Sequence, residues 1–187
     1  RFAAIDRSEE EAKSKLARQN VELNQAHHKL ASAQEVAKTT AGPATAEQVV
    51  AWQMACDVRR KQISLLNQRL ADLTVSRICW DHRYRHILGN GDPEDYQDDL
   101  QRATNYVERL QEAARVITIK ANEARVEQAT LRNRAEGVQT EEHQQWLIFQ
   151  QKELSSLGEA FDTRLVEISS TRQLLSRVID ETKQMLA

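Results

Sequence analysis

The stretch Arg77–Ile87 contains the side chains best suited to chemistry. It reads R-I-C-W-D-H-R-Y-R-H-I, which places His82 and His86 four residues apart. On a helix this spacing puts both imidazoles on one face, as metal ligands require. The stretch lacks the glutamate of a metalloprotease motif, however, and the chain has no E-x-x-H pair of the kind that binds di-iron centres. We therefore expect surface histidines and neither a metal nor another cofactor.

Arginines alternate with aromatic residues in the same stretch, and such an arrangement can stack on nucleic-acid bases. Trp80 and Tyr84, however, fall on the apolar seam of the predicted helix, which directs them toward a core. Acids and bases are interspersed along the chain and the net charge is −2, unlike the basic surface of a nucleic-acid binder. We expect core aromatics flanked by solvated arginines, and no nucleic-acid partner.

The remaining reactive side chains are scattered. His27, His28 and His143 have no pairing partner nearby in the sequence and are expected at the surface. Cys56 and Cys79 lie about 34 Å apart on one predicted helix, too far for a disulfide between them. We expect two buried thiols, with an intermolecular disulfide as the alternative. Phosphate loops, nucleophile elbows and Cys-x-x-Cys motifs are absent, so the sequence predicts no enzyme.

Three arginines interrupt the apolar seams, namely Arg59, Arg77 and Arg164. A buried charge needs a partner, and such pairs often fix the register of helices. Residues at equal distances from a hairpin turn lie level with each other. The predicted turns near Pro43, Gly91 and Val138 give the pairs Arg77 with Glu9, Arg59 with Glu123, and Arg164 with Glu112.

The element that positions most of these residues is a long helix between Val49 and Ile87. Its seam recurs every third or fourth residue for more than five heptads, a spacing that a strand cannot use. We expect Leu66, Leu70, Trp80 and Tyr84 to be largely buried on it. The seam residues are Val49, Trp52, Cys56, Arg59, Ile63, Leu66, Leu70, Leu73, Arg77, Trp80, Tyr84 and Ile87.

Glycine and proline clusters at 42–43, 89–93 and 137 divide the chain into four segments. They predict helices over about 3–38, 46–88, 93–136 and 141–187, with Gly89 as a left-handed cap and Asp92 and Thr140 as N-caps. The fold class is therefore all-α, with more than 80% helix in one elongated domain. We expect a closed up-down-up-down bundle as the first choice, with two coiled-coil hairpins that pack together in part as the second.

Composition agrees with long helices, since the 187 residues include 29% charged and only 5% aromatic residues. No run of about 18 apolar residues occurs, so we expect no membrane span within this sequence. Because it begins with Arg1, we interpret it as a piece of a longer protein.

Gln-, Arg- and Ala-rich helical hairpins that carry Arg77, Trp80, Arg83 and Tyr84 resemble a known family. They are similar to the extramembrane helical regions that precede the pore in large bacterial small-conductance-type mechanosensitive channels. The resemblance implies a non-catalytic periplasmic domain of an oligomeric inner-membrane channel. Its partners would be other subunits or other helices of the full-length protein.

Two other classes of protein fit the same sequence. One is a helical-bundle sensor domain of a bacterial receptor, with a ligand bound between helices near the seam arginines. The other is a cytoplasmic coiled-coil scaffold, which two unpaired cysteines favour slightly over a periplasmic protein. In every case we expect structural or interaction roles for Glu9, Trp52, Arg59, Arg77, Trp80, Tyr84 and Arg164.

Overall fold

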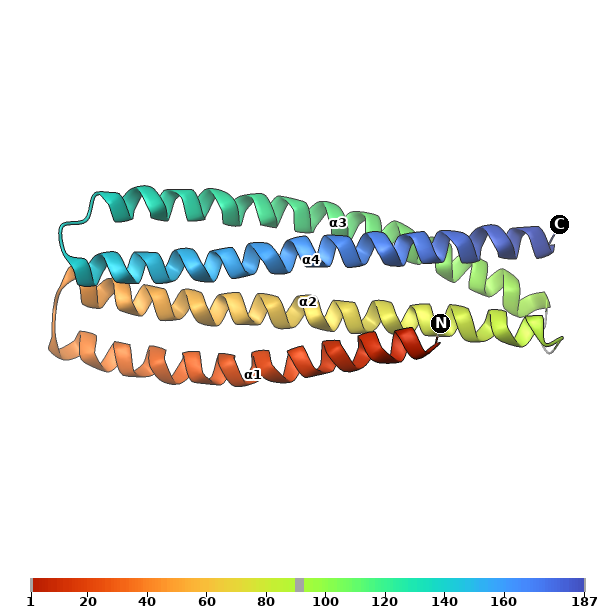
Figure 1. The fold of residues 1–187 in the computed structure, drawn as a ribbon, viewed down its shortest axis with the longest axis horizontal. Helices are drawn as coiled ribbons and strands as arrows, with labels where there is room; N and C mark the ends of the chain where they lie inside the picture. The colour runs from red at the N-terminus through yellow and green to blue at the C-terminus, as the bar shows by residue number, and fades with distance from the viewer. Residues whose placement is uncertain (1, 90–92, 187) are drawn as a thin grey trace.

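The computed structural model describes residues 2–89 and 93–186 and contains four long helices (Figure 1). They are α1 (Phe2–Thr39), α2 (Pro43–Ile87), α3 (Pro93–Glu136) and α4 (Glu141–Leu186). No strand occurs in the described residues. The all-α prediction is confirmed, as are helix boundaries within a few residues of those expected.

The turns follow from local chemistry. α2 begins at Pro43, three residues earlier than predicted, because the fixed φ of proline suits the first helical position. The carbonyl of Gly42 accepts the first helical hydrogen bond, from the amide of Ala46 at 3.0 Å. Gly89 adopts the predicted left-handed conformation, with φ of 75°. The carbonyl of Thr140 likewise accepts the first helical hydrogen bond of α4, from the amide of Gln144 at 3.0 Å. The predicted N-cap Asp92 lies outside the described residues.

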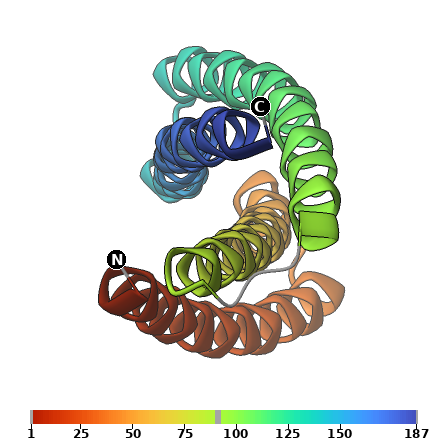
Figure 2. The same cartoon turned by 90° about the vertical axis from the view of Figure 1, so that its right-hand side faces the viewer.

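Successive helices run in opposite directions, so α2 and α4 run parallel to each other (Figure 1). α1 packs on α2, α3 packs on α4, and the two hairpins meet mainly through α2 and α4. Figure 2 shows α1 and α3 on the outside of this central pair. Among the described residues, no Cα of α1 lies within 8 Å of α3 or α4. The bundle is therefore open along one side, as two hairpins joined by their second helices.

The apolar core lies mainly among α2, α3 and α4. Its larger members include Leu65, Leu73, Trp80, Leu110, Ile117, Leu157, Phe161, Ile168 and Leu175. α1 contributes Ile5 and three small residues, Ala12, Ala26 and Ala33, to its buried face. Small side chains allow α1 to lie close against α2 without a wide core between them.

Burial on the predicted seam of α2 varies along its length. Trp80 is buried, as predicted, whereas Leu66 and Leu70 are only half-buried. The prediction for Tyr84 is wrong, since 53% of this residue is exposed. Its ring makes an edge-to-face contact with Phe2 at the start of α1, with ring centroids 6.3 Å apart. Phe2 is the first described residue of α1. Residues of α2 after Tyr84 therefore have little of α1 beside them.

Candidate functional site

Polar side chains line the contact between α2 and α4 over most of its length. We call this set the α2–α4 polar seam. On α2 it comprises Glu47, Arg59, Gln62, Arg69, Asp72 and Arg83, and on α4 Gln150, Glu153, Ser156, Arg164, Thr171 and Glu181. Every member pairs with a residue of the opposite helix, so the polar seam joins the two hairpins.

The centre of the polar seam is a buried ion pair between Asp72 and Arg164. The Arg164 guanidinium lies 2.7 Å from the Asp72 carboxylate, and each side chain is only 3% exposed. Tyr106 of α3 donates its hydroxyl to the same carboxylate at 2.9 Å. Burial, followed by the charge of Asp72, raises the pKa of the Tyr106 phenol far above its ordinary value, which keeps it a donor. Three helices thus meet at one carboxylate.

Arg59 connects three helices through ion pairs. Its guanidinium lies 2.7 Å from Glu153 of α4 and 3.0 Å from Glu22 of α1. One turn further along α2, Gln62 donates to the Ser156 hydroxyl at 2.9 Å. Through Arg59, α1 is therefore linked to α4 as well as to α2.

The polar seam continues toward the end of α2. Arg69 donates to the Thr171 hydroxyl at 3.2 Å, and its Nε lies 3.6 Å from Glu167. Arg83 pairs with Glu181, and its guanidinium lies 5.0 Å from the centroid of the Trp80 ring. This geometry permits a cation–π contact, so Trp80 contributes to the seam as well as to the core.

Glu47 forms the opposite end of the polar seam, near the α3–α4 turn. Its carboxylate accepts hydrogen bonds from Gln150 at 2.6 Å and Arg134 at 2.9 Å, and lies 3.2 Å from His143. Burial alone would raise the pKa of Glu47, but the contacts with Gln150, His143 and Arg134 outweigh it and lower that pKa. The prediction of an isolated surface His143 is therefore wrong.

The three predicted arginine pairs have different outcomes. Arg77 lies 2.9 Å from Glu9, as predicted, and also contacts Asp6. The pairs of Arg59 with Glu123 and of Arg164 with Glu112 are wrong. Both arginines belong to the α2–α4 contact, and distance from a turn cannot place a residue that faces the other hairpin.

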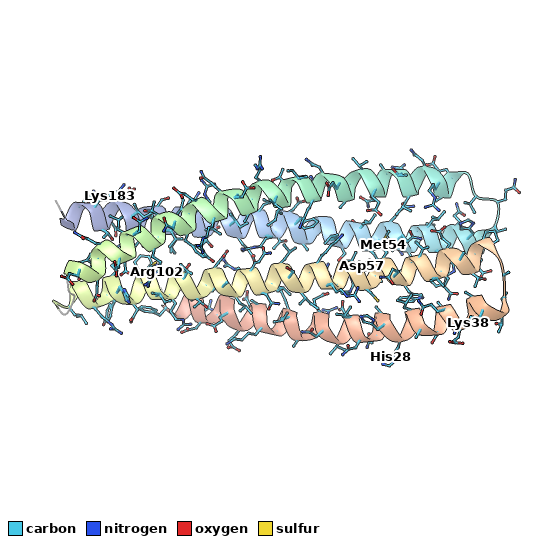
Figure 3. The ribbon with its side chains drawn as sticks, turned by 180° about the vertical axis from the view of Figure 1, so that it is seen from behind. His28, Lys38, Met54, Asp57, Arg102 and Lys183 are labelled. Atoms are coloured by element: carbon cyan, nitrogen blue, oxygen red, sulfur yellow. The ribbon has the colours of Figure 1, made fainter. Side chains whose placement is uncertain are left out.

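The other predicted residues form smaller contacts. Trp52 packs against Trp146 and Phe149, with ring centroids 6.2 and 5.0 Å apart, between α2 and α4. Met54 packs nearby against the Leu131–Leu147–Leu154 cluster (Figure 3). These aromatic and apolar side chains fill the end of the inter-hairpin contact next to the turns.

The histidines and cysteines are dispersed. His28 points from α1 away from the bundle (Figure 3), and the exposed His27 contacts Arg60 at 3.3 Å. His82 contacts Asp99 of α3. Cys56 and Cys79 are buried and free, and burial raises the pKa of Cys79 to about 11. Within residues 2–89 and 93–186, no group of three or more His, Cys, Asp and Glu residues is arranged to hold a metal ion.

Sequence reasoning missed most of the polar seam. A second 3-4 register on α2 carries it, running through Gln62, Arg69, Asp72, Ser76 and Arg83. That register is largely polar, so it resembles a solvent-facing stripe. The available signal was its interruption by Val58, Leu65 and Cys79, three apolar residues that an exposed face does not need.

None of the helices, over the part of the chain that the structure describes, is apolar for long enough to cross a membrane. Comparisons with known proteins found no match: no protein-family model fits the chain, and neither a curated protein nor a solved structure is significantly similar to it.

Proposed function

We propose that this chain is a non-catalytic helical spacer and interaction domain in the periplasmic part of a mechanosensitive ion channel. The observation that carries the proposal is the joining of two long hairpins by a polar seam with a buried centre. Helices of 38 to 46 residues correspond to about 57–69 Å of stiff backbone. The resemblance carried by Arg77, Trp80, Arg83 and Tyr84 supports the class of channel.

The proposed mechanism is mechanical. A load along one hairpin reaches the other through α2 and α4, and the hydrogen bonds and ion pairs of the polar seam resist sliding between them. Sliding by one turn would separate Asp72 from Arg164 and leave both charges buried, which is costly. The domain would therefore pass strain between neighbouring parts of the channel as one body. Its partners would be other subunits or helices of the full-length protein.

Deletion of residues 1–187 from the full-length protein, followed by patch recording, tests this function. We expect a shifted tension threshold for gating or weaker subunit assembly. The variant Arg164→Leu should shift the threshold in the same direction, whereas the exposed control Arg115→Leu should not. If threshold, conductance and assembly all remain unchanged after the deletion, the channel proposal fails.

The proposed compartment has its own test. A reporter enzyme that is active only in the periplasm, fused after residue 187 of the full-length protein, should be active. Activity of a matching cytoplasmic reporter instead would favour the coiled-coil scaffold.

One structural observation favours a second candidate, the ligand-binding sensor domain. A groove between α1 and α4, lined by charged as well as apolar residues, passes beside Arg164. Ligands of helical bundles bind between helices, where polar groups converge.

A further inference from the structure

A groove runs between α1 and α4, with α2 as its floor. It consists of two adjacent hollows of about 240 and about 450 Å³, both lined by Ser8 and Arg69. α1 and α4 flank α2 without approaching each other (Figure 2). The floor includes apolar groups such as Leu65 and Leu73, but most of the wall residues are polar.

Charges of both signs line the smaller hollow. On the α1 wall, Glu11 and Lys15 are exposed, one turn apart, and neither forms an ion pair with any residue of the described ranges. On the opposite wall, Glu167 of α4 lies 3.6 Å from Arg69 on the α2 floor. Two acids and two bases thus line this hollow, and they suit a molecule that also carries both charges.

The floor and wall of this hollow contain two polar atoms that lack hydrogen-bond partners among the described residues, Nε of Arg164 and Oε1 of Gln19. The two Nη atoms of Arg164 contact Asp72 and Glu167, so Nε is the nitrogen that has no acceptor among the described residues. The amide nitrogen of Gln19 donates to Glu22 at 3.3 Å, so its Oε1 is the atom that has no donor among the described residues. One atom needs an acceptor and the other a donor. Both are shielded from bulk water, where a missing partner costs free energy.

We propose that this groove binds a small zwitterion of the size of a free amino acid. Its carboxylate lies toward Lys15 and Arg69, above Arg164, and its ammonium lies toward Glu11 and Glu167. A simple anion would meet two carboxylates, and an apolar molecule would leave the polar walls unpaired. Engagement of Nε of Arg164 and Oε1 of Gln19 requires local side-chain adjustment, which is common on binding.

The test is thermal unfolding of the purified 187-residue chain with each of the twenty standard amino acids. We expect at least one to raise Tm in a saturable way, by about 5–10 °C at 100 times its Kd. Acetate and ethylammonium, which each carry only one of the two charges, should not reproduce the shift. Calorimetric titration of the same amino acid should give one site per chain.

Matched variants locate the site. Lys15→Gln should weaken the affinity about tenfold, because it removes a charged partner of the carboxylate. Lys29→Gln, an exposed lysine of α1 outside the groove, should leave the affinity unchanged. The inference is overturned if no amino acid raises Tm, if acetate or ethylammonium raises it equally, or if the two variants bind alike. Such a failure would leave the spacer function standing, because that function does not depend on the groove.

Discussion

The contacts within each hairpin and the contact between the hairpins are built from different chemistry. Within the α3–α4 hairpin, large apolar side chains such as Leu110, Ile117, Leu147 and Leu175 are buried. Between the hairpins, the apolar residues share the interface with the α2–α4 polar seam. Apolar packing stabilises a contact without fixing its register closely, whereas paired charges and hydrogen bonds favour one register. The difference indicates that the hairpins supply stability and the seam supplies their alignment.

The largest expected effect comes from breaking the buried pair of the seam. Arg164→Leu leaves the Asp72 carboxylate buried without its cation and should cost about 3–5 kcal/mol in the free energy of unfolding. Chemical denaturation measures this loss. The double variant Asp72→Leu, Arg164→Leu should recover much of it, because no unpaired charge then remains. A loss below about 1 kcal/mol for Arg164→Leu would show that the pair is solvated.

A comparable loss is expected inside a hairpin, by a different mechanism. Leu175→Ala removes a side chain that is fully buried and should cost about 2–5 kcal/mol by leaving a cavity. Leu70→Ala is the matched control on the α1 side of α2, and its loss should be smaller because Leu70 is half-buried. Equal losses for the two variants would contradict the difference in burial between Leu175 of α4 and Leu70 of α2. High salt should change neither value much.

A smaller effect is expected for the pair of Glu9 and Arg77, which lies within the first hairpin but is partly exposed. A double-mutant cycle with Glu9→Gln and Arg77→Gln should show favourable coupling that decreases as salt is added. Arg77 also contacts Asp6 and Glu9 also contacts Lys13, so each single variant loses a further ion pair and only the cycle isolates the coupling between Glu9 and Arg77. Additive single effects at low salt would mean that the two side chains do not interact.

The smallest expected effect is a pH dependence at the end of the seam. The pKa of Glu47 is lower in the folded chain than its ordinary value of 4.5. Its ionised form therefore contributes stability above pH 4.5, which is lost as the pH falls through the folded-state pKa. The variant Glu47→Gln should show a shallower decline of Tm in acid than the original chain, with Glu127→Gln as an exposed control. If Tm falls equally with decreasing pH in all three proteins, the Glu47 carboxylate does not contribute to stability in this way.

The helices and one face of α2 could be predicted from the sequence, because they follow from local chemistry. Gly89 and Gly137 mark turns, and the 3-4 register of α2 identifies a face that carries contacts with α1, such as that of Arg77 with Glu9, although Trp52 and Arg59 on it also contact α4. The pairing of Arg77 with Glu9 could also be predicted, because a short turn makes distances along two antiparallel helices equal.

The contact between the hairpins could not be predicted in the same way. Arg59 of α2 faces α4, and Arg164 of α4 faces α2. These two helices run parallel and are not joined by a single turn, so no turn sets their register. Asp72 and Gln62 belong to a mainly polar stripe of α2. This stripe is buried only because α4 of the other hairpin packs against it. The spacing of residues along one helix does not contain that information.

The parallel direction of α2 and α4 has an electrostatic consequence. Each helix has a macrodipole with its positive end at the N-terminus, so parallel neighbours place like ends side by side. The carboxylate of Glu47 lies just after the first turn of α2, and Glu141 and Glu142 occupy the first turn of α4. Toward the other end, α2 carries Arg83 and the last turn of α4 carries Lys183. The acidic side chains offset the positive N-terminal ends of the two dipoles, and the basic side chains offset their negative C-terminal ends. The parallel pair thus carries compensating charges at both ends.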